Sequence, residues 1–131
     1  MQHWLKAIGH AKGPLEDDWL AERPASLSRT GFPRRPRMAP GDRCVYYASV
    51  WRVVFAVVEV VSDPELTGRA GTDRWPWTVA VESLLLIPRL DRAPPVEAIG
   101  VPARSMSQQS HIRLSPEHFT RAVDAIASVA L

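Results

Sequence analysis

The chain has 131 residues, 46% of them hydrophobic, which is enough for one ordinary core, and we expect a single domain over residues 1–131. Sixteen basic against fourteen acidic residues give a formal net charge of +2, which alone says little about a polyanionic partner. The sequence has no run of about 18 uncharged apolar residues, and its single cysteine excludes an internal disulfide and a cysteine-based metal cluster. We therefore expect a cytoplasmic protein that does not enter a membrane.

The first forty residues predict two short elements and a long loop. Residues 2–8 (QHWLKAI) are typical of a short strand. Residues 14–23 (PLEDDWLAER) favour a short helix, since a proline occupies the first position and acidic residues follow in the first turn. Residues 25–42 contain three prolines, two glycines and a cluster of arginines. We expect a long connecting loop there, of the kind that is usually functional or mobile.

The middle of the chain carries strong strand patterns. Residues 43–49 (RCVYYAS) and 52–62 are rich in Val, Tyr and Phe, which favour strands. The second segment is apolar on both alternating faces apart from Glu59. This pattern indicates a central strand that is covered on both sides or bent into a barrel.

Two tryptophans flank a proline at the start of the next predicted strand, TDRWPWTVAVES (72–83). Trp77 shares the parity of the valines that follow it, so it is predicted to face the core. Trp75 has the same parity but precedes Pro76, at an edge where the backbone can turn away. Because an indole buries a large area and also offers a π-face, the pair is compatible with core packing or with the wall of a pocket for a flat ligand.

The last element is the clearest. Residues 111–114 predict a brief strand, and Ser115 is a good N-cap for a helix from Pro116 to about Val129 with an apolar stripe. Several strands with few helices favour a mixed α+β domain built on a small curved or barrel-like sheet.

The sequence offers few signs of enzymatic chemistry. The four histidines lack the H-x-x-x-H spacing of a zinc site, and the G-x-S-x-G, G-x-G-x-x-G and phosphate-loop patterns are missing. We therefore expect no catalytic residue, no metal and no cofactor. Aromatic and arginine residues interleaved with polar loops are instead typical of a base-stacking pocket with a rim that contacts phosphate.

Five motifs in a fixed order carry a family resemblance. HWL near the start, RMAPGDRCVYYAS, VVFAVVEVVSDPE, RWPWTVAVES and SQQSHIRLSPEHF together resemble the EVE domain, a member of the PUA-like superfamily related to the YTH and ASCH domains. The resemblance implies a PUA-like pseudo-β-barrel of five to six strands, with flanking short helices and a C-terminal helix. It also implies a non-catalytic protein with a pocket for a single, often modified, nucleobase of DNA or RNA.

The resemblance implies a set of site residues. Trp75 falls near the tryptophan of the aromatic cage, with Trp77 left to the core, and Ser49 matches a serine at the pocket floor. The remaining base-pocket candidates are Gln109, Ser110 and His111 at the base edge and Phe32 or Trp51 as partner aromatics. The phosphate-binding candidates are Arg34, Arg35, Arg37, Arg104 and Arg113. The loop containing GFPRRPR departs from the family, in which asparagines stand there.

Two other functions stay open. The first is a small hydrolase of modified nucleosides, because the related ASCH branch includes amidohydrolases, although its hallmark G-x-K-x-x-E-x-R is missing here. The second is a protein-interaction module that docks through its proline-rich loop, residues 33–40. The expected partner is nucleic acid, DNA or RNA with a methylated base among the candidates, and a monomer is the simplest expectation for an oligomeric state that the sequence leaves open.

Overall fold

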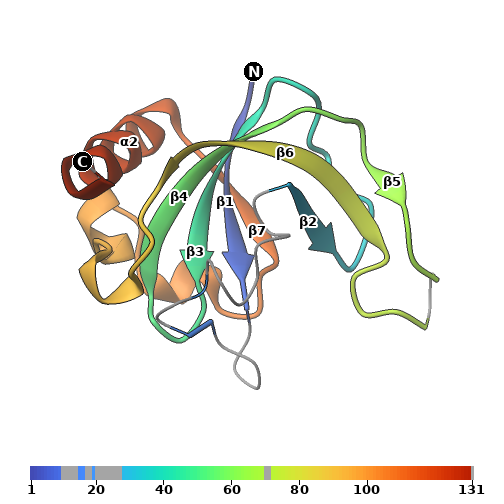
Figure 1. Cartoon of the computed structure of the whole chain (residues 1–131), viewed down its shortest axis with the longest axis horizontal. Coiled ribbons are helices and arrows are strands. Elements are labelled where there is room, and N and C mark those ends of the chain that lie inside the picture. Colours follow the sequence, from blue (N-terminus) through green and yellow to red (C-terminus); the bar gives the residue numbers. More distant parts are fainter. Residues whose placement is uncertain (10–14, 17–18, 20–27, 70–71, 131) are drawn as a thin grey trace.

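The computed structural model describes residues 1–9, 15–16, 19, 28–69 and 72–130, and the strands of this part form one strongly curved sheet (Figure 1). The strands are β1 (His3–Ile8), β2 (Arg29–Phe32), β3 (Arg43–Ala48), β4 (Val53–Val60), β5 (Glu65–Leu66), β6 (Trp77–Leu86) and β7 (His111–Leu114). Their order across the sheet is β2-β6-β4-β3-β1-β7, and β5 pairs with β6. Only β1 and β3 are parallel neighbours among the pairs described.

The curvature of the sheet passes through β6. The first half of this strand pairs with β2, from Trp77 to Ala80, while its second half pairs with β4, from Val81 to Leu86. Figure 1 shows β6 arching from the side of β4 over to β2. The interior strand β4 is buried except at Val53 and Glu59, as its two-sided apolar pattern predicts. The predicted mixed α+β class with a barrel-like sheet is confirmed.

Two strands were not predicted. Residues 29–32 form β2 inside a segment expected to be loop, because the exposed edge of the long β6 provides a partner that its local sequence does not reveal. Thr30 and Phe32 are its two buried residues. The two-residue strand β5 lies in a polar linker and also pairs with β6. The helix predicted at 14–23 falls largely outside the described residues.

The C-terminal helix α2 (Pro116–Ala130) confirms the prediction. The Ser115 hydroxyl accepts a hydrogen bond from the His118 backbone N–H at 3.1 Å, and Phe119, Ala122 and Ile126 bury the apolar stripe. Three 3-10 turns, η2 (Leu90–Arg92), η3 (Val96–Ile99) and η4 (Ala103–Met106), lie between β6 and β7. Among the helices that the structure describes, none is long and apolar enough to span a membrane.

A buried carboxylate ties the start of β1 to the turn before β3. Asp42 is 5% exposed and accepts hydrogen bonds from the Gln2 backbone N–H at 3.0 Å, the Trp4 indole N–H at 3.1 Å and the Ala39 backbone N–H at 3.2 Å. Burial alone would raise its pKa, but these three donors stabilise the charged form, and the pKa lies below its ordinary value. The PGD turn reaches this geometry through Gly41, whose φ is +94°.

Candidate functional site

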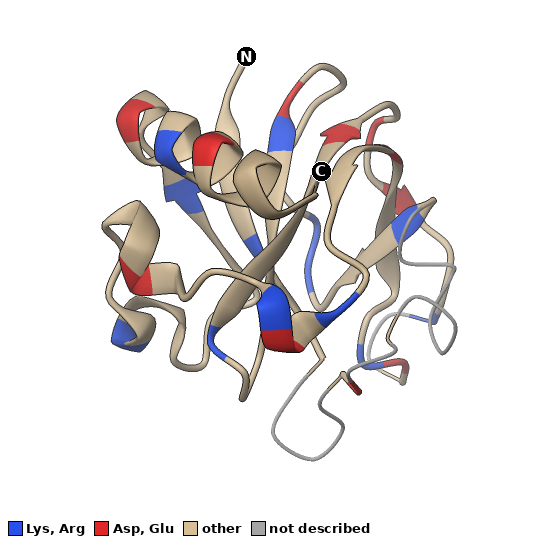
Figure 2. Ribbon diagram, turned by 60° about the vertical axis from the view of Figure 1, so that its left-hand side comes forward, with Lys and Arg blue, Asp and Glu red and all other residues tan. Residues whose placement is uncertain are grey.

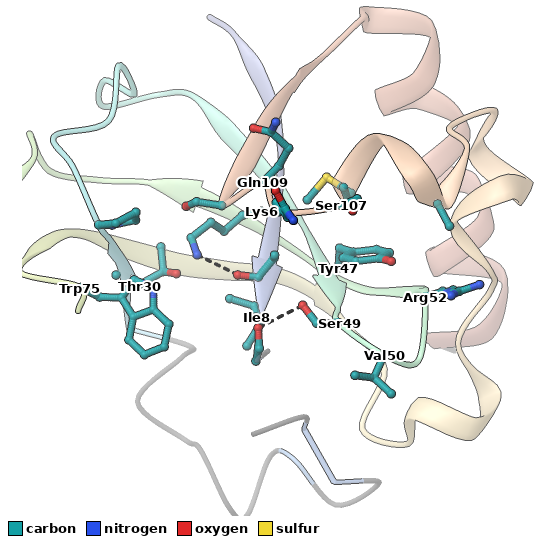
Figure 3. Close-up of a pocket in the computed structure, with 18 of the residues that line it drawn as sticks. Lys6, Ile8, Thr30, Tyr47, Ser49, Val50, Arg52, Trp75, Ser107 and Gln109 are labelled. Carbon is teal, nitrogen blue, oxygen red and sulfur yellow. Dashed lines mark hydrogen bonds between the residues drawn. The ribbon is translucent and has the colours of Figure 1, made fainter. Parts of the chain in front are cut away.

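A pocket of about 1170 Å³ lies where the parallel strands β1 and β3 end. The strand β2, the segment before β6 and the polar loop before β7 complete its walls (Figure 3). The described residues that line it are Lys6, Ala7, Ile8, Gly9, Arg29, Thr30, Gly31, Pro33, Tyr47, Ser49, Val50, Arg52, Arg74, Trp75, Ala103, Arg104, Met106, Ser107, Gln108, Gln109 and Ser110. Segments far apart in the sequence therefore meet at one end of the curved sheet.

The indole of Trp75 forms part of one wall of the pocket and is 43% exposed. It packs against the backbone of β2 at Gly31, where a Cβ atom would lie 3.0 Å from the Cβ of Trp75. The Arg74 guanidinium lies 4.8 Å from the centre of an indole ring of Trp75. A glycine at this position of β2 thus lets a large aromatic side chain approach the strand while much of its surface stays accessible.

Lys6 is a buried cation in the same pocket. Its side chain lies on the face of β1 that also carries Trp4 and Ile8, and the residue is 4% exposed. The Lys6 ammonium donates a hydrogen bond to the Ala7 carbonyl at 2.7 Å and lies 4.9 Å from the centre of the Phe32 ring. Burial lowers the pKa of Lys6 from its ordinary 10.5 to about 8. The side chain is therefore still mainly protonated at pH 7.

The polar side chains of the pocket are partly committed to the protein. The Ser49 hydroxyl donates a hydrogen bond to the Gly9 carbonyl at 3.0 Å, so its oxygen can still accept a hydrogen bond from a ligand. The Thr30 side chain hydrogen-bonds to Tyr46, and the Ser110 hydroxyl lies 3.2 Å from Nδ1 of His111. In Figure 3, Lys6 and Thr30 extend toward Trp75, whereas Ser49 lies on the opposite side.

The described lining of the pocket carries positive charge without negative charge. Among its described residues, five are lysine or arginine (Lys6, Arg29, Arg52, Arg74 and Arg104) and none is aspartate or glutamate. The charge of Arg29 is partly neutralised, since its guanidinium lies 3.5 Å from the Glu65 carboxylate. Over the described chain as a whole, basic and acidic residues are spread over many elements (Figure 2). The excess of positive charge is thus a property of this pocket and not of the protein's overall composition.

Backbone strain is concentrated around the pocket. Val50, Arg52 and Gln108 are the non-glycine residues with positive φ in the described chain, at 76°, 59° and 59°, and all three line the pocket. A positive φ is especially unfavourable for β-branched Val50, which is also 59% exposed. Such strain costs on the order of 1–3 kcal/mol per residue and tends to gather at functional sites.

Solved structures with the same architecture extend over nearly the whole of both chains. Rpa0253 from Rhodopseudomonas palustris is 14% identical, with a TM-score of 0.63 over 98% of this chain and 95% of its own. The human THYN1 protein, in complex with DNA containing 5-methylcytosine, is 13% identical, with a TM-score of 0.59 over 95% and 96%. ZmASCH from Zymomonas mobilis is 13% identical, with a TM-score of 0.57 over 95% and 98%.

The chain has the PUA-like fold. The resemblance to the EVE domain, which predicted this fold from five sequence motifs, is confirmed at that level. No protein-family model matches the sequence, and neither does any curated protein.

The pocket brings together some of the predicted base-pocket residues. Trp75, Ser49, Gln109 and Ser110 line it, and so does Arg104 from the predicted phosphate set. Their roles in binding stay predictions.

The other three base-pocket candidates lie outside the lining. Phe32 is fully buried, and its ring packs edge-on against His111 with 5.1 Å between ring centres. His111 also packs against Trp4, and burial lowers its pKa. The indole N–H of Trp51 donates to the Leu15 carbonyl at 2.6 Å. Phe32 and His111 therefore pack against each other next to Lys6 and Ser110 of the lining.

The predicted arginine cluster also lies apart from the pocket. Arg34, Arg35 and Arg37 are exposed in the segment after β2, and Arg35 lies 5.4 Å from the centre of a Trp77 ring. Arg113 is exposed on β7 and is not part of the lining. In the same segment Pro36 is buried, so the proline-rich loop is partly packed into the protein.

Sequence reasoning missed Lys6, Thr30 and Tyr47. Lys6 carried a usable signal, because it is the one charged residue in the middle of an otherwise apolar strand and shares the parity of Trp4 and Ile8. Thr30 was missed with the strand β2. Tyr47 is 5% exposed and was counted with the apolar residues of β3.

Replacing Lys6 with methionine is expected to change how stability depends on pH. The unfolded lysine titrates near 10.5 and the folded one near 8, so between these values the unfolded state binds more protons and the wild-type free energy of unfolding rises with pH. The stability of Lys6→Met relative to wild type should therefore be greatest at pH 7 and fall by about 2–3 kcal/mol by pH 10.

Urea denaturation of both proteins at several pH values measures this difference. The phenols of Tyr46 and Tyr47, whose pKa values burial raises, are common to both proteins. The Cys44 thiol interacts electrostatically with Lys6, so both proteins carry Cys44→Ala in this comparison. A pH-independent difference would show that Lys6 is not a buried cation.

Proposed function

We propose that the protein binds nucleic acid and holds one nucleobase in the pocket, stacked on Trp75, without converting it. The observation that carries this proposal is an accessible indole in the wall of a pocket whose described lining has five cations and no carboxylate. Stacking on an aromatic ring suits any base, and arginines suit the phosphates that flank it. Nucleic acid is the polymer that supplies both groups together.

The size of the pocket supports a ligand larger than a base alone. Its volume of about 1170 Å³ exceeds the 300–1,000 Å³ that is typical of small-molecule pockets, so a base can enter with part of its sugar and phosphate backbone. Ser49, Gln109 and Ser110 offer hydrogen bonds to its edge. A base that leaves such a polar group unpaired loses on the order of 1–3 kcal/mol, and this loss gives selectivity.

The structural similarity to THYN1 supports a modified base as the ligand. THYN1 was crystallised with DNA containing 5-methylcytosine and has the same fold. A methylated pyrimidine is therefore the first base to test with this protein.

Tryptophan fluorescence titration tests the proposal. Single-stranded oligonucleotides carry one unmodified, 5-methylated, 5-hydroxymethylated or N6-methylated base, at low and at moderate salt. We expect quenching that is strongest for one modification and an affinity that falls steeply with salt, since each neutralised phosphate releases counterions. Equal binding of all oligonucleotides would reject a preference for a modified base, and absent binding of all of them would contradict the proposal.

A hydrolase of modified nucleosides is the second candidate. The structural similarity to ZmASCH and the buried Lys6 amine, with a pKa of about 8, favour it. Incubation with N4-acetylcytidine, followed by chromatography, tests it. Release of cytidine by the wild type, lost in Lys6→Met, would replace binding by catalysis as the function.

A further inference from the structure

The charge of Lys6 is unusually placed. The residue is 4% exposed, its neighbours include the Phe32 ring and apolar residues of β1, and no carboxylate of the described chain forms an ion pair with it. Burying a charge without an oppositely charged partner costs free energy, and ionisable groups in such surroundings are concentrated at functional sites. A methionine would fill the same space without that cost.

The ammonium of Lys6 has N–H donors that remain available for a ligand. A lysine ammonium has three N–H donors, and the Ala7 carbonyl takes one of them in the described structure. Figure 3 shows the amine reaching from β1 toward Thr30 and Trp75, on the side of the pocket where the base is proposed to stack. Arg52, Arg74 and Arg104 add further positive charge to the lining.

We propose that the ligand brings an anionic oxygen group, a phosphate or a carboxylate, into the pocket and that Lys6 binds it. The inference rests on the proposed function in one respect, which is that the anion belongs to a nucleotide: a terminal phosphate, or a carboxylate carried by the base itself. An anion restores the charge balance that the described lining lacks, which a neutral base edge cannot do.

Anion binding at Lys6 should be coupled to proton uptake by its amine. A bound anion favours the charged amine and raises its pKa above the value of about 8 in the free protein. Because burial brings the pKa of Lys6 to about 8, binding near this pH should take up a measurable fraction of a proton. Affinity should fall about tenfold from pH 7 to pH 9.

Calorimetry with four ligands tests this inference. Cytidine 5′-monophosphate is compared with cytidine, and an oligonucleotide with one 5-carboxylcytosine is compared with one containing 5-methylcytosine. We expect at least one anionic ligand to bind about tenfold or more tightly than its neutral counterpart in the wild type. The first pair identifies a phosphate and the second a base carboxylate as the group that Lys6 binds.

Two variants and two buffers complete the experiment. The preference for the anionic ligand should disappear in Lys6→Met and persist in Arg121→Met, which removes a positive charge from exposed α2. Wild-type titrations at pH 8, in buffers of different ionisation enthalpy, report proton uptake without any variant. An anionic preference that survives in Lys6→Met, no proton uptake, or no binding of any anionic ligand would overturn the inference.

The failure of this inference is separable from failure of the proposed function. A loss of affinity for the 5-methylcytosine oligonucleotide in Trp75→Ala but not in Lys6→Met would support the base-binding function and reject anion binding at Lys6. Binding of cytidine 5′-monophosphate that depends on Lys6, with no oligonucleotide binding, would keep the anion and reject the nucleic-acid function.

Discussion

Replacing Asp42 with alanine should lower the free energy of unfolding by about 3–5 kcal/mol. The carboxylate accepts hydrogen bonds from the backbone of Gln2 and Ala39 and from the Trp4 indole, so its loss leaves three donors without this acceptor. Trp4 is itself 7% exposed and belongs to the core. The expected loss is a large part of the stability of an ordinary domain, which is about 5–15 kcal/mol.

Chemical denaturation at pH 7 measures the effect. Asp63→Ala is the matched control, because Asp63 is exposed and its loss should change stability by less than about 0.5 kcal/mol. Since the folded pKa of Asp42 is lowered, its contribution is present above the unfolded pKa and is lost as the pH falls through the folded value. The gap between wild type and Asp42→Ala should therefore narrow in acid. A loss below about 1 kcal/mol at pH 7 would show that the three hydrogen bonds do not hold β1 in place.

Trp75→Ala should weaken nucleic-acid binding about 10- to 100-fold while lowering the free energy of unfolding by less than the roughly 3–5 kcal/mol that loss of a buried tryptophan costs. Base stacking on an aromatic side chain contributes roughly 1–3 kcal/mol per base. The indole is 43% exposed, so its removal costs the core little. Leu84→Ala is the control for loss of an exposed apolar side chain, because Leu84 is 45% exposed and does not line the pocket.

Fluorescence anisotropy of a labelled oligonucleotide gives both affinities, and thermal melting reports stability. Unchanged affinity in Trp75→Ala would remove the indole from the binding site. A collapse of stability would instead make Trp75 a packing residue that caps the end of the sheet.

Much of the fold was predictable because strand and helix periodicities are local. The Val-, Tyr- and Phe-rich segments 43–49 and 52–62 correspond to β3 and β4, and the capped stripe of residues 115–129 corresponds to α2. β2 escaped prediction because a short strand containing a glycine exists only through its pairing with β6. Such a pairing depends on the curvature of the whole sheet.

The candidate site was predictable only where a side chain's direction follows from its strand. Trp75 could be separated from Trp77 because a proline between them marks the edge of a strand. Phe32 was assigned to the pocket because its segment was expected to be a loop, whereas it is the last residue of β2 and is fully buried. Lys6 was passed over although a lone charge in an apolar strand is a usable signal, because the strand pattern alone does not show that this face of β1 borders a pocket.

The indole N–H resonances of the five tryptophans provide the most direct test of base stacking in the pocket. Each tryptophan gives one signal in an ¹⁵N-correlated NMR spectrum, and the indoles of Trp4 and Trp19 are tied to Asp42 and to the Ile87 carbonyl inside the core. Titration with the oligonucleotide that binds best should shift the Trp75 signal most and leave those of Trp4 and Trp19 in place. A largest shift at Trp51 or Trp77, with Trp75 unmoved, would contradict a base-binding function for this pocket.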